Sequence, residues 1–425
     1  MDAFLIKGGR PLHGEVNISG SKNATLPLMA ATLLTNEPCT LRGIPNLSDV
    51  RFMGDILRSL GAEVAFTDDS VTIHAHKIHE FGKYDLIRKM RASICILGPL
   101  IGRLGRARVS LPGGCIIGAR PIDLHLKGLR ALGAKFTIRG GYVLGETKRL
   151  QGSEVFLGGR VGPTVLGTAN VMMAAALAEG TTLIESAACE PEIIDVANFL
   201  TAMGARIQGV GGPTITVTGV DKLHGAVHEV IPDRIEAATF AVSAAVTRGE
   251  ITLRNARPDH LGAVLDKLRE AGVRAERQGP NLVVSRGRSR LRPVDITTQP
   301  YAGFPTDVQA QMMVLMLLVP GISVITERIF EARFMHVPEL CRLGAEISIE
   351  GPSAIVKGGR PLSGAQVMAS DLRASAALVL AGLAAEGATT VKRVYHLDRG
   401  YDRMDEKLRR LGARIERIPD RPESD

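Results

Sequence analysis

A three-residue phrase centred on glycine recurs six times along the 425 residues of this chain. The copies lie at 60–62, 132–134, 203–205, 271–273, 343–345 and 411–413, so successive glycines are 72, 71, 68, 72 and 68 residues apart. An amphipathic stretch precedes each copy and an extended pattern follows it, which is typical of a glycine that ends a helix in the left-handed conformation. Repetition at this period predicts six structural units of roughly seventy residues each.

A second phrase recurs in step with the first: an Ala-rich apolar stretch, a turn and a β-rich run, as at 172–186 and 240–254. The turn has a glycine at 105, 180, 249, 321 and 387, and the segment 36–38 in the first unit. Stretches that are apolar nearly all round are typical of helices buried on every side. Because 425 residues exceed what one core holds, we expect an α/β fold of two similar lobes, each with three units whose sheets surround the buried helices.

The composition limits the partners of the chain. A net charge of +8 fits either a nucleic-acid surface or several arginines that hold a small polyanion. The second interpretation is favoured, because there is no long basic run and aromatic residues make up only 4%. The first residues lack the layout of a signal peptide, and the apolar stretch 312–319 is too short to span a bilayer, so we expect a cytoplasmic protein without a membrane partner.

Charged side chains gather where the six buried helices are expected to begin, namely in the segments that start at Ser21, Arg91, Arg160, Asp233, Pro305 and Asp371. The charged residues there are Lys22, Arg91, Arg160, Arg234, Glu236, Asp307, Asp371 and Arg373. A helix N-terminus offers free N–H groups and a positive dipole end, which suit phosphate and carboxylate ligands. Ordinary N-caps explain the aspartates equally well, but they do not explain the cations.

The glycine-rich segment LPGGCIIGARP at 111–121 places a thiol, Cys115, five residues before Arg120. A nearby guanidinium lowers the pKa of a thiol, so this side chain could donate or accept a proton near neutral pH or attack carbon. The other cysteines, at 39, 95, 189 and 341, are expected to be buried and inert. An odd number of cysteines without a C-x-x-C pair argues against disulfides or a zinc site and for a reducing compartment.

Two further segments leave two interpretations open. The segment 327–340 surrounds Arg333 with acidic residues, and the segment 394–408 carries His396, Asp398 and Arg399 before an amphipathic helix. Either segment could contribute ligand-binding groups, or it could be a capped loop with surface salt bridges.

Blocks spread from Phe4 to about Ile418 resemble the UDP-N-acetylglucosamine 1-carboxyvinyltransferases of the enolpyruvyl transferase superfamily. These blocks are ISGSKNA at 18–24, KMRASI at 89–94, LPGGCIIGARP at 111–121, EPEIID at 190–195, PDRIE at 232–236, FPTDVQAQ at 304–311, RFMHVPEL at 333–340, DLRASAALVLAG at 371–382 and HLDRGYDR at 396–403. The resemblance implies two lobes, each an inverse α/β barrel of three units, with the active site in the cleft between them. It assigns 22–231 to the lobe with the Cys115 segment, and 1–21 with 232–425 to the lobe with Asp307.

The resemblance also implies roles for individual residues. Phosphoenolpyruvate contacts are implied for Lys22, Asn23, Arg120 and Arg399, and UDP-sugar contacts for Arg91, Arg120, Pro121, Ile122, Asp123, Leu124, Arg160, Val161, Gly162, Pro163, Asp307 and Ile329. Arg333, Asp371 and Arg373 match further cleft residues. Cys115 matches the proton donor and fosfomycin target, and Asp307 the residue that takes the proton of the sugar 3-hydroxyl.

The implied function is enolpyruvyl transfer from phosphoenolpyruvate to UDP-N-acetylglucosamine in peptidoglycan synthesis, with no metal, cofactor or obligate protein partner. Departures from the family pattern are Ala332, Ala237 and the pair Gly162–Pro163, and none of them removes a charged group. The alternatives are the shikimate branch of the superfamily, which does not use the cysteine segment, and a paralogue that binds the UDP-sugar without turnover. A nucleic-acid-binding repeat protein is a third alternative.

Overall fold

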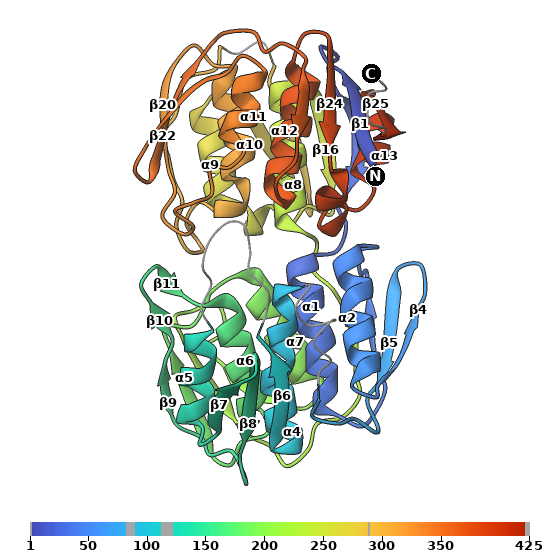
Figure 1. Ribbon diagram of the computed structural model, residues 1–425, viewed down its shortest axis with the longest axis vertical. Helices are drawn as coiled ribbons and strands as arrows, with labels where there is room; N and C mark the ends of the chain where they lie inside the picture. Colours follow the sequence, from blue (N-terminus) through green and yellow to red (C-terminus); the bar gives the residue numbers. More distant parts are fainter. Residues whose placement is uncertain (1, 82–89, 112–121, 288–289, 421–425) are drawn as a thin grey trace. The chain divides into compact units, whose positions relative to one another are not determined.

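The computed structural model describes residues 2–81, 90–111, 122–287 and 290–420. They form two compact units, one of residues 20–231 and one of residues 2–19 with 232–420, here called the Lys22 unit and the Asp307 unit (Figure 1). Residues 20 and 21, expected in the second unit, belong to the first. Ser21 caps the helix that begins at Lys22, and its N–H donates to the carbonyl of Ile231.

The Lys22 unit alternates helices with short strands. Its helices are α1 (Lys22–Ala31), η1 (Thr32–Leu34), α2 (Ser48–Ser59), η2 (Arg91–Ile96), α4 (Leu97–Leu104), α5 (Asp123–Ala131), α6 (Val165–Ala175) and α7 (Pro191–Ala202). Its strands are β3 (Cys39–Arg42), β4 (Glu63–Phe66), β5 (Ser70–His74), β6 (Arg106–Ser110), β7 (Lys135–Arg139), β8 (Tyr142–Glu146), β9 (Glu154–Phe156), β10 (Gly158–Gly159), β11 (Gly162–Pro163), β12 (Thr181–Glu185), β13 (Arg206–Gln208), β14 (Thr214–Thr218) and β15 (Val227–Glu229).

The Asp307 unit repeats the same alternation. Its helices are α8 (Arg234–Val246), η3 (Pro258–His260), α9 (Gly262–Glu270), η4 (Thr306–Val308), α10 (Gln309–Leu317), α11 (Val337–Arg342), α12 (Leu372–Ala384), η5 (Val394–Arg399) and α13 (Met404–Arg410). Its strands are β1 (Asp2–Lys7), β2 (His13–Asn17), β16 (Glu250–Arg254), β17 (Arg274–Gln278), β18 (Asn281–Ser285), β19 (Ile296–Thr297), β20 (Gly321–Thr326), β21 (Glu346–Glu350), β22 (Ser353–Gly358), β23 (Gln366–Met368), β24 (Ala388–Lys392) and β25 (Arg414–Pro419).

The sheets share one topology. The four-stranded sheets have the orders β13-β14-β12-β9, β15-β3-β5-β4, β23-β24-β1-β25, β17-β18-β16-β2 and β19-β20-β22-β21. Each has one parallel pair, such as β9 with β12, and two antiparallel pairs. A three-stranded sheet, β6-β8-β7, is seen within the described ranges, and an isolated parallel bridge joins Phe81 to Arg108 at the edge where the four-stranded sheets have their parallel strand. The recurrence confirms an α/β chain with mixed sheets that is built from a repeated unit.

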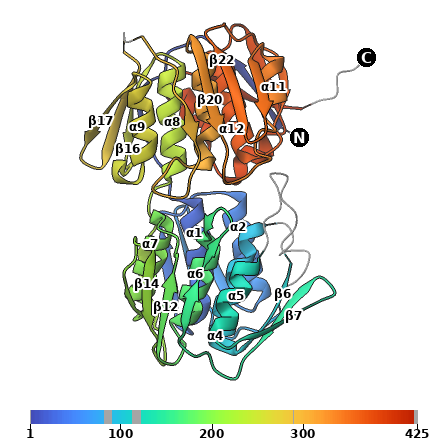
Figure 2. The same ribbon diagram turned by 90° about the vertical axis from the view of Figure 1, so that its left-hand side faces the viewer.

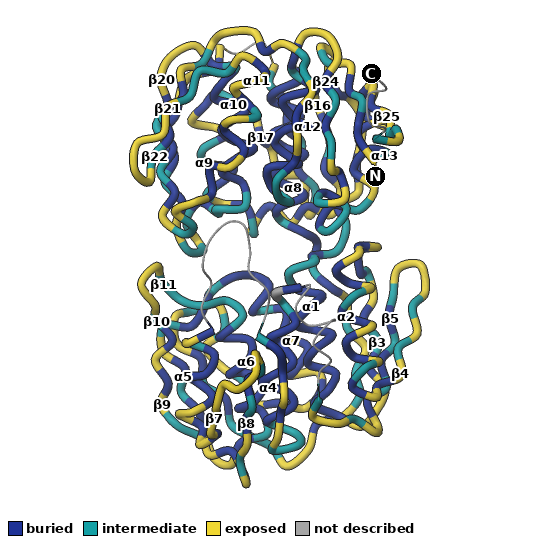
Figure 3. Tube along the Cα trace, viewed as in Figure 1, coloured by how far each residue is buried: buried dark blue, intermediate teal, exposed yellow. Residues whose placement is uncertain are grey.

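Each unit has its own apolar core around helices that the sheets surround (Figures 1 and 2). In the Asp307 unit α8, α10 and α12 pack on one another, and every residue of α10 is buried. The Ala-rich sequences allow this close approach, because small side chains leave room between helix backbones. Figure 3 shows the buried interior of both units, and the exposed residues gather on the outer strands and turns. No helix in the described ranges is long and apolar enough to cross a membrane.

The repeated glycines end the outer helices as predicted. Gly61, Gly133, Gly204, Gly272, Gly344 and Gly412 have φ values of 99, 93, 102, 94, 88 and 99°. The turn between α8 and β16 differs in its backbone from the turns at Gly105, Gly180, Gly321 and Gly387, whose glycines have positive φ. Arg248 takes the left-handed conformation there, with φ 57°, and Gly249 allows close approach, since a Cβ on it would lie 2.0 Å from the carbonyl oxygen of Leu12.

Candidate active site

Asp307 lies between two arginines in the Asp307 unit. It sits in η4 immediately before α10, Arg333 follows β20, and Arg373 is the second residue of α12. Oδ1 of Asp307 lies 2.7 Å from Nη2 of Arg333, and Oδ2 accepts a hydrogen bond from Nη2 of Arg373 at 3.1 Å. Both arginines are almost fully buried. Asp307 is therefore not a helix cap but the centre of an ion-pair cluster, and Arg333 is not a surface salt-bridge residue.

Asp307 and its two arginines together carry a net charge of +1 at neutral pH, and Asp233 is a further carboxylate whose charge acts on Arg373. Burial alone would raise the pKa of Asp307, but the charges of Arg373 and Arg333 outweigh burial and hold this pKa well below its usual value. Burial disfavours the charge of Arg373, yet the neighbouring Asp307 raises the pKa of that guanidinium. Nη1 of Arg373 is buried and has no hydrogen-bond acceptor in the part of the chain that the structure describes. An anionic ligand would satisfy both the charge and the donor.

Asp371 caps α12, because its carboxylate accepts hydrogen bonds from two backbone N–H groups of the first turn at 2.8 and 3.0 Å. Its negative charge also raises the pKa of two histidines, but burial and nearby arginines outweigh this effect. Burial, aided by the charge of Arg333, lowers the pKa of His336 to about 4, and burial with the charge of Arg399 lowers the pKa of His396. The start of α12 thus faces the segments that carry Arg333 and Arg399.

A buried carboxylate, Glu327, anchors the segment around this cluster. Its oxygens accept hydrogen bonds from the hydroxyls of Thr298 and Thr306 at 2.7 and 2.8 Å. They also accept from the backbone N–H groups of Ile329 and the following residue at 2.8 and 3.0 Å. The hydroxyl of Thr306 accepts in turn from Nη1 of Arg333 at 2.9 Å. Glu327 therefore fixes both the Ile329 segment and the side chain beside Asp307.

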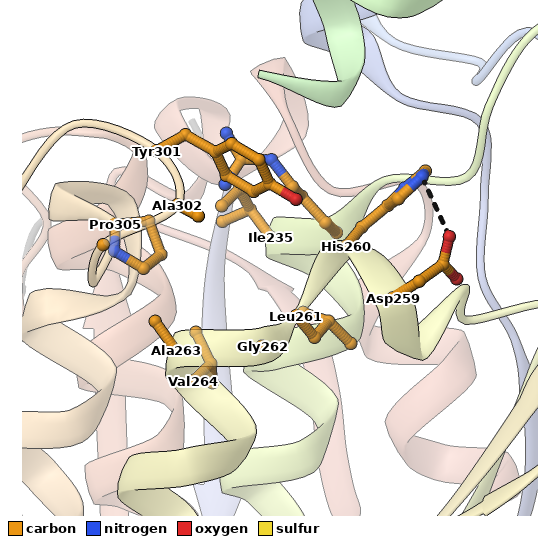
Figure 4. A pocket seen from close by; sticks show the side chains of 12 residues that line it. Ile235, Asp259, His260, Leu261, Gly262, Ala263, Val264, Tyr301, Ala302 and Pro305 are labelled. Atoms are coloured by element: carbon orange, nitrogen blue, oxygen red, sulfur yellow. Dashed lines mark ion pairs between the residues drawn. The ribbon is translucent and has the colours of Figure 1, made fainter. Parts of the chain in front are cut away.

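A small cavity lies at the start of α8, lined by α9 and the 301–305 loop (Figure 4). The guanidinium of Arg234 lies 5.3 Å from the ring centre of Tyr301, and Nε2 of His260 lies 3.6 Å from a carboxylate oxygen of Asp259. The loop continues through Pro305 into η4, so the last residue of the loop that lines the cavity is two residues before Asp307 in the sequence. Glu236 does not line it. This buried carboxylate pairs with Lys407 and accepts from the N–H of Ser19, which makes its role structural.

In the Lys22 unit, Lys22 and Asn23 open α1, which Ser21 caps. Nζ of Lys22 lies 3.4 Å from the carboxylate of Asp49 on α2, and both side chains are largely buried. Arg91 begins η2, but its side chain is outside the described part of the structure, as are Cys115, Arg120 and Pro121.

The predicted UDP-sugar residues 122–124 and 160–163 meet in the same unit. Ile122 precedes α5, and Asp123 and Leu124 open it. Residues 158–163 form a hairpin of β10 and β11, so Arg160 is at a turn and the third buried helix begins only at Val165, capped by Thr164. A Cβ on Gly159 would lie 2.9 Å from Leu124, so hairpin and helix are in contact. The second and fifth buried helices begin as the 3₁₀ helices η2 and η4, which continue into α4 and α10.

The described cysteines are free thiols, and their burial matches the prediction only in part. Burial raises the pKa of Cys39 to about 11 and that of Cys95 to about 12, so both are inert at neutral pH. Cys189 is half-buried, with a raised pKa caused by burial and by Glu190. The prediction is wrong for Cys341, which is exposed on the outer helix α11.

The family model described as EPSP synthase (3-phosphoshikimate 1-carboxyvinyltransferase) matches residues 6–408. A protein of Methylacidiphilum infernorum named UDP-N-acetylglucosamine 1-carboxyvinyltransferase is 55% identical over 98% of this chain and 99% of its own length. A relative of Desulfosudis oleivorans with the same name is 53% identical over 98% of this chain and its full length. This chain belongs to the UDP-N-acetylglucosamine 1-carboxyvinyltransferase family. As members of that family are carboxyvinyl, or enolpyruvyl, transferases, the chain is a transferase.

Solved structures agree with this family at the level of the fold. The enolpyruvyl transferase NikO from Streptomyces tendae superposes with a TM-score of 0.90 at 27% identity over 98% of this chain and 99% of its own. An EPSP synthase of Acinetobacter baumannii has the same fold, with a TM-score of 0.74 at 19% identity over 99% of this chain and 100% of its own.

Sequence reasoning missed the anchoring role of Glu327 and its partners. Thr298 and Thr306 lie 21 to 29 residues from Glu327 in the sequence, so no local pattern links the three. A usable signal was the acidic residue at the end of the β20 pattern ISVITE, where a strand enters the segment that carries Ile329. In the second open segment, Asp398 forms a two-point ion pair with Arg417 of β25 at 2.7 and 3.0 Å, so this carboxylate is held in a salt bridge.

Proposed function

We propose that this chain transfers the enolpyruvyl group of phosphoenolpyruvate to the 3-hydroxyl of UDP-N-acetylglucosamine and releases phosphate, in the cytoplasm, at the first committed step of peptidoglycan precursor synthesis. One observation carries the proposal: an ionised, half-buried Asp307 between two buried arginines lies in a chain whose nearly full-length relatives bear the name of this activity. The identity of 51–55% to these relatives, against 19% for an EPSP synthase, favours the UDP-sugar over shikimate 3-phosphate.

The proposed binding groups divide by substrate. Phosphoenolpyruvate is assigned to Lys22, Asn23, Arg120 and Arg399, and the UDP-sugar to Arg91, residues 120–124, residues 160–163, Asp307 and Ile329. The contact between the hairpin and Leu124 supports the second set, because it joins two of its stretches into one surface. The unpaired Nη1 of Arg373 and the excess positive charge beside Asp307 support anion binding in the Asp307 unit.

The proposed reaction has two steps. Cys115 gives a proton to C3 of phosphoenolpyruvate while O3 of the sugar bonds to C2 and Asp307 takes the hydroxyl proton. The resulting tetrahedral ketal then loses a proton from C3 and expels phosphate, which restores the C2–C3 double bond. Fixed cations are needed at both stages, because the two substrates are anionic and charge shifts onto the leaving phosphate.

The arginine pair explains how Asp307 could change its basicity on binding. The two oxygens of Asp307 contact two guanidinium groups, which lower its pKa and so make the carboxylate a weak base. An anionic substrate that takes over Arg373 or Arg333 would remove this stabilisation and raise the pKa of Asp307. We propose that the carboxylate becomes an effective base only when both substrates are bound.

We also propose that each unit is an inverse α/β barrel of three repeats. The support is topological: the same strand order recurs around helices that are buried on all sides. In the described ranges, each unit has three sheets of three or four strands, three buried helices and three outer helices, and the Lys22 unit adds the two-stranded sheet β10-β11 and both units add short 3₁₀ helices.

The test is phosphate release from phosphoenolpyruvate with UDP-N-acetylglucosamine, with shikimate 3-phosphate as the parallel acceptor. Release only with the UDP-sugar, blocked by fosfomycin, is expected. Cys115→Ser and Asp307→Ala should bind the UDP-sugar and lose turnover by at least about a hundredfold, the usual contribution of a general acid or base. Release with shikimate 3-phosphate, or no release with either acceptor, would refute the proposal, and full turnover in either variant would remove that residue from the mechanism.

A further inference from the structure

Two histidines and a glutamate converge on the β4–β5 hairpin at the edge of a sheet of the Lys22 unit. Glu63 begins β4, and His74 ends β5 directly opposite it in the antiparallel pair. His76 lies in a bend two residues after His74, and the centres of the two rings are 4.5 Å apart. The three side chains are half-buried or exposed, so an ion could reach them from solvent.

The spacing of their ligand atoms fits a single small cation. Nδ1 of His74 lies 3.6 Å from one carboxylate oxygen of Glu63, and Nδ1 of His76 lies 3.9 Å from the other. Each residue offers one ligand atom, and all three such atoms lie within 4.8 Å of one another. Tetrahedral ligands at about 2.0–2.1 Å from Zn²⁺ are roughly 3.4 Å apart, so small side-chain rotations would complete the site.

A hydrogen bond to the far side of one ring prepares it for metal binding. Nε2 of His74 donates a hydrogen bond to the backbone carbonyl of Asn36 at 3.1 Å, so Nδ1 is the ring nitrogen that faces Glu63. Metal-ligating histidines usually donate their second ring nitrogen in this way. The next histidine, His79, differs, since its Nδ1 accepts from the N–H of Phe81 at 3.4 Å.

We propose that Glu63, His74 and His76 bind a divalent transition-metal ion, with Zn²⁺ as the best fit. Two imidazole nitrogens and one carboxylate oxygen form a ligand set that Zn²⁺ accepts, and water would complete the coordination. The ion would link β4 to β5 and, through His74, to the chain at Asn36. The proposal does not depend on the enzymatic function of the chain.

Isothermal titration of tag-free, EDTA-treated full-length protein with ZnCl₂ tests the site. All proteins carry Cys115→Ser and Cys341→Ser, because free thiols also bind zinc. Adding His74→Ala with His76→Ala should abolish one equivalent of binding or weaken it at least tenfold. The matched control, His79→Ala, should bind as the parent does.

Two further measurements keep the test decisive. Glu63→Gln removes only one ligand and should weaken zinc binding while the melting temperature without metal stays unchanged. Crystals soaked in zinc should give an anomalous peak between the three side chains at the zinc edge. Equal isotherms for the parent and the double-histidine variant, or an anomalous peak elsewhere with none at this hairpin, would overturn the proposal.

Discussion

Substitution of Glu327 by Gln isolates the anchor of the segment that carries Ile329. The carboxylate is fully buried and accepts four hydrogen bonds, three of them at Oε1 and one, from Thr306, at Oε2. Gln keeps an acceptor at Oε1 but places an NH₂ group against the hydroxyl of Thr306. That hydroxyl already accepts a bond from Arg333, so its own proton loses its acceptor.

The expected cost follows from this count. A hydrogen bond to a charged group contributes about 1.5–3 kcal/mol, and a neutral one about 0.5–1.5 kcal/mol. Loss of the bond at Oε2 and weakening of the three at Oε1 together give an estimate of about 3 kcal/mol for Glu327→Gln. At roughly 2–4 °C per kcal/mol for a unit of this size, the melting temperature of the Asp307 unit should fall by about 6–12 °C. Glu327→Ala leaves four donors unpaired and should cost about 4 kcal/mol or more.

Differential scanning calorimetry measures the stability, and initial rates measure the function. Because Ile329 is a proposed UDP-sugar contact, KM for the UDP-sugar should rise by a larger factor than kcat falls. The matched control is Glu350→Gln on the exposed end of β21, which should melt within about 1 °C of the parent. A Glu327→Gln protein that melts like this control, with an unchanged KM, would refute the anchoring role.

Three further predictions rest on burial and backbone geometry. Gly133→Ala should lower the free energy of unfolding by about 1–2 kcal/mol, because its φ of +93° is strained for alanine. Gly61→Ala should lower it clearly more, because its Cβ would also lie 2.4 Å from a carbonyl oxygen, and urea denaturation of both variants measures the difference. Because the pKa of Asp307 is lowered in the folded state, its ionised carboxylate stabilises the fold fully above the unfolded pKa of about 3.9, and this stabilisation is lost as the pH falls toward the folded-state pKa. Asp307→Asn should therefore flatten the acid limb of a curve of unfolding free energy against pH. Iodoacetamide at pH 8 should label exposed Cys341 in the native protein but Cys95 only after unfolding, as read by peptide mass mapping; native labelling of Cys95 would contradict its burial.

The repeated architecture could be predicted from sequence because each seventy-residue repeat needs the same residue types at the same places. A helix that ends in a residue with the left-handed backbone conformation favours glycine at that residue. A helix surrounded by sheets needs small apolar residues on all sides. Both patterns therefore recur about every seventy residues. The third buried helix shows the limit of such reasoning. Residues 158–163 form a hairpin through pairing of Gly158 with Pro163, and the segment from Arg160 gives no local sign of this pairing.

The site could be predicted in its charged residues but not in their pairing. Asp307 and Asp371 both precede buried helices, and by sequence either could be a cap or a ligand-binding group. The carboxylate of Asp371 caps α12 by accepting a hydrogen bond from a backbone N–H only two residues further along the chain. The carboxylate of Asp307 instead contacts guanidinium groups from positions 333 and 373. Capping is a local interaction that sequence spacing captures, but the pairing of Asp307 with two buried arginines depends on residues brought together by the whole unit. The same fold that half-buries Asp307 thus supplies two buried cations that keep it ionised, and their excess charge makes the place suitable for an anionic substrate.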